Sequence, residues 1–336
     1  MQPYALDLGN GYTKFSRGST PQMMPSYICE ALDPSELCDD IGFGAIIKYT
    51  GGERTDLAGR IWAVGEAAKT SFPGAFSRVV DSENSTGKVD FALHFALAGL
   101  PPMSHGQYFQ IPMMYASLPD PALLGNAFKR AIIGTHRYIH NGVEASATID
   151  DVTVLHEGQG AFVYALSQGV FPSGTANAII DCGNGTTIAQ AFSPNGHLIP
   201  KSRTVSQVGV FHLLKSIASD IRFKKTLGKE GNIHLIQQAI EDGSLSYGSR
   251  NIDISNIYRE HRNRWASQAL KKALEKFSTM KDEIDTILLI GGGANIVKIL
   301  AEKKDSIELC PEPQLANVLG LAKLADKRIR NLRSVA

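Results

Sequence analysis

The sequence has few of the features that mark secreted proteins, membrane-spanning proteins or proteins stabilised by a structural metal ion. Its four cysteines form no CxxC pair and no His/Cys cluster with zinc-site spacing, so neither a disulfide framework nor a zinc finger is expected. No run approaches the ~18 apolar residues of a membrane span. The chain also enters a strand pattern directly after its first residues. We therefore expect a reduced, cytoplasmic protein without a signal peptide or membrane contact.

An excess of charge of one sign is also missing. The 34 basic and 33 acidic residues leave a formal net charge of +1, whereas duplex-binding proteins usually show a basic face or a raised pI. We therefore expect no direct sequence-specific binding to nucleic acid, and any such contact would run through a partner. The basic C-terminal helix expected at 315–332 is typical of a solvated face.

Several common catalytic signatures are absent as well. There is no G-x-x-x-x-G-K-[ST] loop, no G-x-G-x-x-G fingerprint, no G-x-S-x-G elbow and no H-R-D/D-F-G kinase set. P-loop NTPases, protein kinases and α/β-hydrolases are thereby excluded, and a dinucleotide fold loses its main support. The composition is that of a folded enzyme, and 336 residues favour two domains over one core.

Three apolar runs end in glycine: YALDLGNG at residues 4–11, ANAIIDCGNG at 176–185 and TILLIGGG at 286–293. A strand that stops at a glycine-rich turn is a common phosphate site, because the backbone N–H groups there can point at the anion. The first two runs share D-x-G-N-G-x-T, as Asp7–Thr13 and Asp181–Thr187. Two related half-molecules that face one ligand explain this repeat.

The residue types of the repeat suit a magnesium-bound polyphosphate. Asp7 and Asp181 would repel phosphate, but they suit a hydrated Mg²⁺, which keeps several waters and takes few carboxylates. The hydroxyls of Thr13 and Thr187 can donate to phosphate oxygens, and Lys14 supplies a positive charge for the β/γ-phosphates. The alternative is a hairpin turn whose Asp and Asn satisfy the local backbone. Two copies together with Lys14 argue against it.

Strand patterns alternate with helix patterns along the chain, which is typical of α/β sheets. We expect strands within 56–70 (before a turn) and at 108–118, 152–156, 177–182, 188–192 and 286–290, and helices at 89–99, 123–133, 160–168, 210–223, 232–242, 254–280, 294–301 and 315–332.

The motifs together resemble the actin superfamily, which also includes seventy-kilodalton heat-shock chaperones and sugar kinases. Within it, the chain is most similar to the ParM/StbA group of plasmid-segregation actins and their archaeal relatives. The first phosphate loop of this family, D-x-G-x-x-x-T-K, matches Asp7–Lys14, and the second matches Asp181–Thr187. Its adenosine motif, an apolar strand that ends in Gly-Gly before a helix, matches Leu288–Ala294.

Three further stretches carry the resemblance. The two connecting segments of the family are similar to His156–Ala161 and Pro313–Gly320, and Trp62–Ala67 resembles the Y-x-V-G-x-x-A of the ParM branch. The motifs follow the order of the family and cover nearly the whole chain. Segments 30–55 and 135–150 match none of them.

The resemblance implies an α/β, actin-like fold of two domains with ribonuclease-H-like topology and the nucleotide in the cleft between them. Domain I would comprise residues 1–160 plus 311–336, and domain II residues 161–310. ATP, or else GTP, would bind with Mg²⁺, whose water shell Asp7 and Asp181 would hold. The implied nucleotide-binding residues are Asp7, Gly9, Asn10, Gly11, Tyr12, Thr13, Lys14, Gly183, Asn184, Gly185, Thr186, Thr187, Gly291, Gly292 and Gly293.

The resemblance assigns catalysis to Glu157 together with Asp181. Glu157 follows the strand expected at 152–156, and in-line attack on a γ-phosphate needs a group that orients the water. The residues alone favour a different role, an exposed acid that caps the next helix, but the resemblance outweighs it.

Two assignments near the adenosine motif stay open. Gly291–Gly293 could equally be a strand-to-helix turn without a ligand. Lys229, Glu230 and Asn232 lie where the family begins a helix near the base, although their surroundings also suit a plain loop.

The function implied is an ATPase whose filaments use hydrolysis as a timer, because loss of the γ-phosphate removes the contacts that favour the polymerising state. The implied partners are further copies of the chain and a DNA-bound adaptor that couples filaments to plasmid DNA. Two alternatives stay open. One is a small-molecule kinase of the same superfamily, although no convincing D-x-G-G-T-x-x-R is present. The other is a non-polymerising, chaperone-like regulator.

Overall fold

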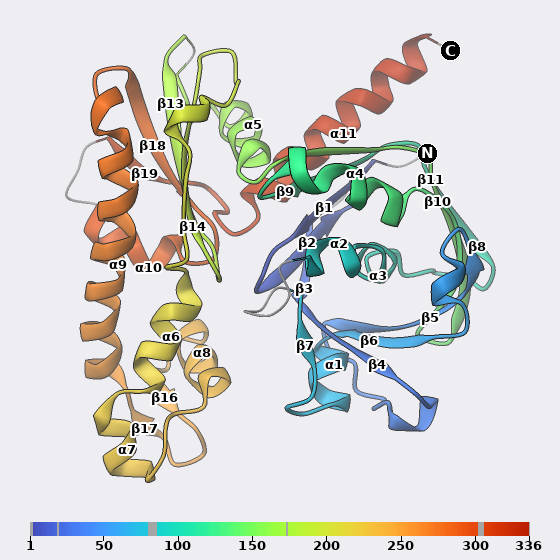
Figure 1. Cartoon of the computed structure of the whole chain (residues 1–336), viewed down its shortest axis with the longest axis horizontal. Helices are drawn as coiled ribbons and strands as arrows, with labels where there is room; N and C mark the ends of the chain where they lie inside the picture. The colour runs from blue at the N-terminus through green and yellow to red at the C-terminus, as the bar shows by residue number, and fades with distance from the viewer. Residues whose placement is uncertain (1–2, 19, 80–85, 173, 302–305, 336) are drawn as a thin grey trace. The chain divides into compact units, whose positions relative to one another are not determined.

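The computed structural model describes residues 3–18, 20–79, 86–172, 174–301 and 306–335, which fold as two compact units (Figure 1). The first unit comprises residues 1–169 and 315–336, and the second comprises residues 170–314. The first unit extends past the boundary expected at residue 160, because helix α5 (Gln159–Ser167) packs against α11 (Ala316–Val335) of that unit.

The first unit contains a five-stranded sheet with β1 at its centre. β2 and β3 continue it antiparallel on one side, and β9 and β12 run parallel to β1 on the other. β1 is fully buried, as a continuous apolar run predicts for a central strand. Helix α11 packs on the sheet, with Val318 and Leu321 against Ala5. The strands are β12 (Val152–His156), β9 (Met114–Leu118), β1 (Tyr4–Leu8), β2 (Tyr12–Ser16) and β3 (Gln22–Pro25).

The second unit contains a five-stranded sheet of the same topology. Its central strand β13 has the antiparallel strands β14 and β15 on one side and the parallel strands β18 and β19 on the other. In each sheet the D-x-G-N-G-x-T motif joins the central strand to its antiparallel neighbour, so the expected α/β, ribonuclease-H-like topology is confirmed. The strands are β15 (Thr204–Ser206), β14 (Thr187–Phe192), β13 (Ala176–Cys182), β18 (Ile284–Ile290) and β19 (Ile307–Leu309).

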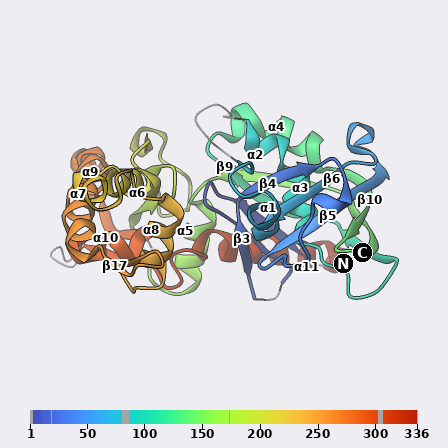
Figure 2. The same cartoon turned by 90° about the horizontal axis from the view of Figure 1, so that it is seen from below.

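The segments that match no family motif, 30–55 and 135–150, help to build a second sheet of the first unit. This sheet has seven strands in the order β7-β4-β6-β5-β10-β11-β8. Helices α1 (Glu66–Ser71) and α3 (Ala92–Ala98) lie against its strands (Figure 2). The strands are β7 (Ser77–Arg78), β4 (Tyr27–Ala31), β6 (Ile61–Gly65), β5 (Gly44–Gly52), β10 (Gly134–His140), β11 (Val143–Ile149) and β8 (Gln107–Ile111).

The remaining helices lie within their own units, and α9 and α10 pack against the five-stranded sheet of the second. In the second unit, Trp265 of the long helix α9 donates its Nε1–H to the carbonyl of Gly209, 3.0 Å away, at the start of α6. No helix among the described residues is long and apolar enough to span a bilayer. The helices are α1 (Glu66–Ser71), α2 (Gly87–Asp90), α3 (Ala92–Ala98) and α4 (Pro121–Ile132) in the first unit; α6 (Val210–Ala218), α7 (Ile221–Leu227), α8 (Ile233–Glu241), α9 (Ser255–Phe277) and α10 (Ala294–Ala301) lie in the second, with the hairpin β16 (Ser246–Tyr247) and β17 (Ile252–Asp253).

Four expected elements differ from the structure. The helix expected at 89–99 is two helices, α2 and α3. The single strand expected at 108–118 is two strands, β8 and β9, in different sheets, and Pro112 lies between them without an N–H for a ladder. The helix expected at 210–223 breaks after Ala218, because the Asp220 carboxylate caps a new helix by accepting from the Arg222 N–H at 2.9 Å. The strand within 56–70 leads into α1 rather than a turn.

The crossing of α5 and α11 depends on two glycines. A Cβ on Gly320 would overlap the backbone carbonyl of Gly160, and a Cβ on Gly160 would overlap the backbone of Asn317. We expect Gly320→Ala to destabilise the protein by about 1–3 kcal/mol, since the helices must separate to admit the methyl group. Thermal denaturation checks this.

Gly125 provides the matched control for Gly320. It lies inside helix α4, and a Cβ there would meet only Val154, at 3.9 Å. Gly125→Ala should therefore leave stability unchanged or raise it slightly, because alanine favours a helix interior. Equal melting temperatures for Gly320→Ala and the wild type would contradict this account of the helix crossing.

Candidate functional site

The first repeat forms a tight hairpin that places Asp7 opposite Lys14. The two residues are cross-strand partners of β1 and β2, and the Lys14 Nζ lies 3.3 Å from Asp7 Oδ2. A Cβ on Gly9 would lie 2.7 Å from the carbonyl of Tyr12 and 3.1 Å from the Lys14 Nζ, so only glycine fits there. The Gly11 carbonyl accepts from the N–H of Ser26 at 2.9 Å, which ties the turn to the neighbouring strand β3.

Asp7 lies at the centre of a buried polar cluster. Its Oδ1 accepts from Ser117 Oγ at 3.1 Å and from Asn317 Nδ2 at 3.0 Å. Burial acts to raise the pKa of Asp7, but the positive charges of Lys14 and Lys88 and the Asn317 hydrogen bond outweigh it and lower that pKa. Asp7 is therefore held as a carboxylate. Asn317 lies in the second connecting segment, whereas Ser117 carries no sequence signal.

The threonines of both repeats bond inside their own units. Thr13 is fully buried, and its Oγ1 lies 2.9 Å from Ser26 Oγ, which donates to the Gly9 carbonyl at 2.5 Å. Thr187 is also buried, and its Oγ1 donates to the carbonyl of Val208 at 2.8 Å. These contacts fix the shape of the loops, and a contact of the two hydroxyls with phosphate stays a prediction.

Glu157 lies at the end of β12 and forms an ion pair that the sequence did not predict. Its backbone N–H donates to the Leu118 carbonyl at 3.0 Å, which holds the residue against β9. Its Oε1 accepts from the Nζ of Lys88 in helix α2, and both side chains are largely buried, 12% and 7% exposed. The first unit therefore gathers two acids and two lysines near the first loop: Asp7, Lys14, Lys88 and Glu157.

The second repeat is held by the start of helix α6. The carbonyls of Gly183 and Asn184 accept from the N–H groups of Val210 and Phe211 at 3.0 and 2.8 Å. Gly183 itself donates to the carbonyl of Thr186 at 2.9 Å, which closes the turn. A Cβ on Gly209 would collide with the loop backbone at Asn184 and Gly185. The loop is therefore fixed by its backbone.

The glycine triplet of the third motif packs against the second repeat. Gly291 has a φ of +86°, and a Cβ there would collide with the Asp181 carboxylate and lie 2.7 Å from the Cys182 carbonyl. The N–H of Gly293 donates to the same carbonyl at 2.9 Å, while Gly292 is exposed. The second unit thus brings Asp181 and Gly291–Gly293 together.

The first loop offers oxygen ligands that suit the water shell of a magnesium ion. The side-chain Oδ1 of Asn10 in this loop is buried and lacks a hydrogen-bond partner among the described residues. Together with the carboxylate of Asp7 it offers oxygen, the ligand atom that Mg²⁺ prefers. Asn317 takes no part, because its amide turns Nδ2 toward Asp7 and Oδ1 toward Gly160. Among the described residues, no group of three or more His, Cys, Asp or Glu side chains has metal-site geometry.

The residues left open near the adenosine motif have structural partners. Asn232 caps helix α8, with its Oδ1 accepting from the His234 N–H at 2.9 Å. The exposed Glu230 pairs with Lys224 at 3.2 Å. These contacts are those of a loop followed by a helix cap.

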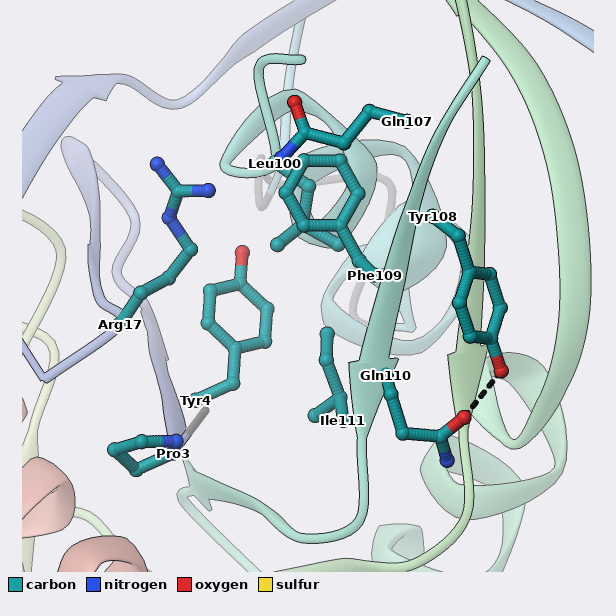
Figure 3. Close-up of a pocket in the computed structure, with 9 residues that line it drawn as sticks. All are labelled: Pro3, Tyr4, Arg17, Leu100, Gln107, Tyr108, Phe109, Gln110 and Ile111. Carbon is teal, nitrogen blue, oxygen red and sulfur yellow. Dashed lines mark hydrogen bonds between the residues drawn. The ribbon is translucent and has the colours of Figure 1, made fainter. Parts of the chain in front are cut away.

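A pocket of about 200 Å³ also lies in the first unit, and none of the motif residues lines it (Figure 3). Tyr4, Arg17 and Phe109 point toward one another there, and the Arg17 guanidinium lies 5.6 Å from the centre of the Phe109 ring. This cation–π contact, together with the apolar walls, gives Arg17 a packing role.

Two family models match the chain in succession. The N-terminal domain of actin-like proteins matches residues 5–160, and the C-terminal domain of an archaeal MreB-like actin homologue matches residues 179–302. Together they match most of the chain. The protein belongs to the actin-like superfamily. The comparison with curated protein sequences gives no match.

Solved structures share the fold at low sequence identity. An archaeal actin homologue superposes with a TM-score of 0.79 at 17% identity, covering 98% of this chain and 100% of the homologue. A 15-stranded ParM filament from Clostridium botulinum gives 0.74 at 16%, with 97% and 100% covered. Bacillus thuringiensis ParM with ATP gives 0.70 at 17%, with 98% and 99% covered.

Proposed function

We propose that this protein binds and hydrolyses ATP with Mg²⁺ and uses the cycle to assemble and disassemble filaments. The observation that carries the proposal is the repeat: one D-x-G-N-G-x-T hairpin at the same place in two sheets of identical topology. One copy adds a buried cluster of two acids and two lysines. A structural hairpin needs neither the repetition nor these charges.

In this proposal the residues of the two loops, the glycine triplet and Glu157 have separate roles. Backbone N–H groups of both loops bind phosphate oxygens. Lys14 meets the β- and γ-phosphates, and Asp7 and Asp181 hold the water shell of Mg²⁺, which neutralises phosphate charge when it is bound. Gly291–Gly293 accept the adenosine against the backbone. Glu157 orients the attacking water.

Filament formation is supported by the structural relatives. One of them is a ParM filament, and the archaeal homologue and B. thuringiensis ParM have been solved with ADP and ATP, respectively. We extend the proposal to a cytoplasmic filament that segregates plasmid DNA through a DNA-bound adaptor, as the resemblance to ParM implies. ATP is proposed over GTP because the relatives hold adenine nucleotides.

The concentration dependence of turnover tests this proposal against its alternatives. Polymer-coupled hydrolysis predicts that phosphate release per subunit rises above a threshold protein concentration, measured with ATP and Mg²⁺. A small-molecule kinase would give turnover per subunit that is independent of protein concentration and requires an added sugar or alcohol acceptor. A non-polymerising regulator would bind ATP, and its turnover would depend neither on protein concentration nor on an added acceptor. Either of these last two results contradicts the proposal.

A further inference from the structure

Lys88 is a buried cation whose partner is the proposed catalytic acid. It is only 6% exposed, and its Nζ donates to Glu157 Oε1. Lysine is rarely buried without a partner, because desolvating an ammonium ion is costly. The ion pair therefore explains how Lys88 is tolerated at this depth, and it commits one oxygen of the Glu157 carboxylate to a fixed direction.

The backbone around both residues is anchored. Lys88 belongs to α2, where Val89 donates to the Thr86 carbonyl at 2.7 Å and packs its side chain on the hydrophobic core of the first unit. The Glu157 N–H is bonded to the Leu118 carbonyl of β9, at 3.0 Å. Two rigid elements thus meet through one ion pair, which restricts the rotamers of the long side chains on both sides.

The pair also lies within electrostatic reach of the first phosphate loop. The positive charge of Lys88 helps to lower the pKa of Asp7. Lys88 therefore lies near both acids of the buried cluster, Asp7 and Glu157. It directly contacts Glu157, whereas Asp7 has Lys14 as its own partner.

We propose that Lys88 is the positioning residue of Glu157: it holds the carboxylate in one orientation, so that the attacking water is held in line. This inference rests on the proposed hydrolytic function. A carboxylate has room for several hydrogen bonds, so the bond from Lys88 leaves acceptor capacity for a water. A misplacement of about 1 Å in such a group can cost ~10²-fold in rate.

The first test examines the ion pair in nucleotide-free protein. Melting temperatures are measured for the wild type, Lys88→Met, Glu157→Gln and the double variant. Each single change should lower the melting temperature by several degrees, and the double variant should lose clearly less than the sum, because it leaves no unpaired buried charge. Strictly additive losses would show that the pair does not form in solution and would overturn the inference, whether or not the protein hydrolyses ATP.

The second test measures turnover with ATP and Mg²⁺. Lys88→Met should lower kcat by about 10- to 100-fold with little change in KM, and Lys88→Arg should recover part of the loss because it keeps the charge. In the Glu157→Gln background, Lys88→Met should lower kcat no further. An equal loss in both backgrounds, or a wild-type kcat for Lys88→Met, would overturn the inference.

A matched control variant and the wild type distinguish failure of the Lys88 inference from failure of the proposed function. Lys271 forms an exposed pair with Glu275 at 3.9 Å in helix α9, and Lys271→Met should change neither the melting temperature nor kcat. If the wild type itself releases no phosphate, the proposed function fails together with the role of Lys88 in turnover. A coupled pair in the melting experiment would then show that the contact is structural only.

Discussion

Replacing Glu157 by glutamine should slow ATP hydrolysis by ~10²-fold or more, the usual scale for a positioned acid–base group. Glutamine keeps the size of the side chain but cannot take a proton or hold a water with a full negative charge. Nucleotide binding should change little, because Glu157 is proposed to contact the water and not the nucleotide. Single-turnover phosphate release and titration with a fluorescent ATP analogue measure the two quantities separately.

Glu144 supplies the matched control for this substitution. It lies on β11 of the same unit, is exposed, and pairs with the exposed His105, at 3.2 Å. Glu144→Gln should hydrolyse ATP at the wild-type rate. The assignment of Glu157 is wrong if Glu157→Gln is as fast as the wild type. It is also wrong if Glu157→Gln loses activity only in proportion to lost nucleotide binding.

The two D-x-G-N-G-x-T hairpins could be predicted from the sequence because their signal is local. Each strand is a continuous apolar run, and each ends in glycines at a fixed distance from an aspartate and a threonine. The same residues recur in the second half, which identified the internal repeat. The shared topology of the two sheets confirms the expected fold. The burial of Thr13 and Thr187 could not be predicted from the local sequence, because it depends on neighbours from other strands.

Segments 30–55 and 135–150, which supply strands of the seven-stranded sheet, matched no family motif, although part of them has a local signal. Asn141 and Gly142 join β10 to β11 with φ angles of 49° and 81°, and such an Asn-Gly pair between alternating residues is a strong hairpin signal. The order of the strands in this sheet has no such local signal in the sequence. Its strands come from residues 27–78 and 107–149 and pair across long connections.

Lys88 could not be identified as a site residue from the sequence. It lies in a four-residue helix without hydrophobic periodicity, and its partner Glu157 is 69 positions away. A lysine in such a segment is usually exposed. Only the packing of α2 in the first unit shows that this one is buried, and that it meets the acid which the resemblance had singled out.

Assembly is the second large effect that we expect. A contact that fits the triphosphate-bound subunit better than the diphosphate-bound one, and does not close on itself, produces a filament rather than a ring or dimer. The critical concentration should therefore be low with ATP or a non-hydrolysable analogue and much higher with ADP. Filaments of Glu157→Gln should persist after wild-type filaments have disassembled, because the hydrolysis that ends their lifetime is slowed.

Sedimentation of the wild-type protein tests the central claim most directly. Protein at tens of micromolar, an order-of-magnitude choice for weak contacts, is centrifuged with Mg²⁺ and either ATP, a non-hydrolysable analogue or ADP. We predict that most of the protein pellets with ATP and with the analogue and that most of it stays in the supernatant with ADP. Protein that stays in the supernatant under all three conditions would contradict the filament account and favour a kinase or a non-polymerising regulator.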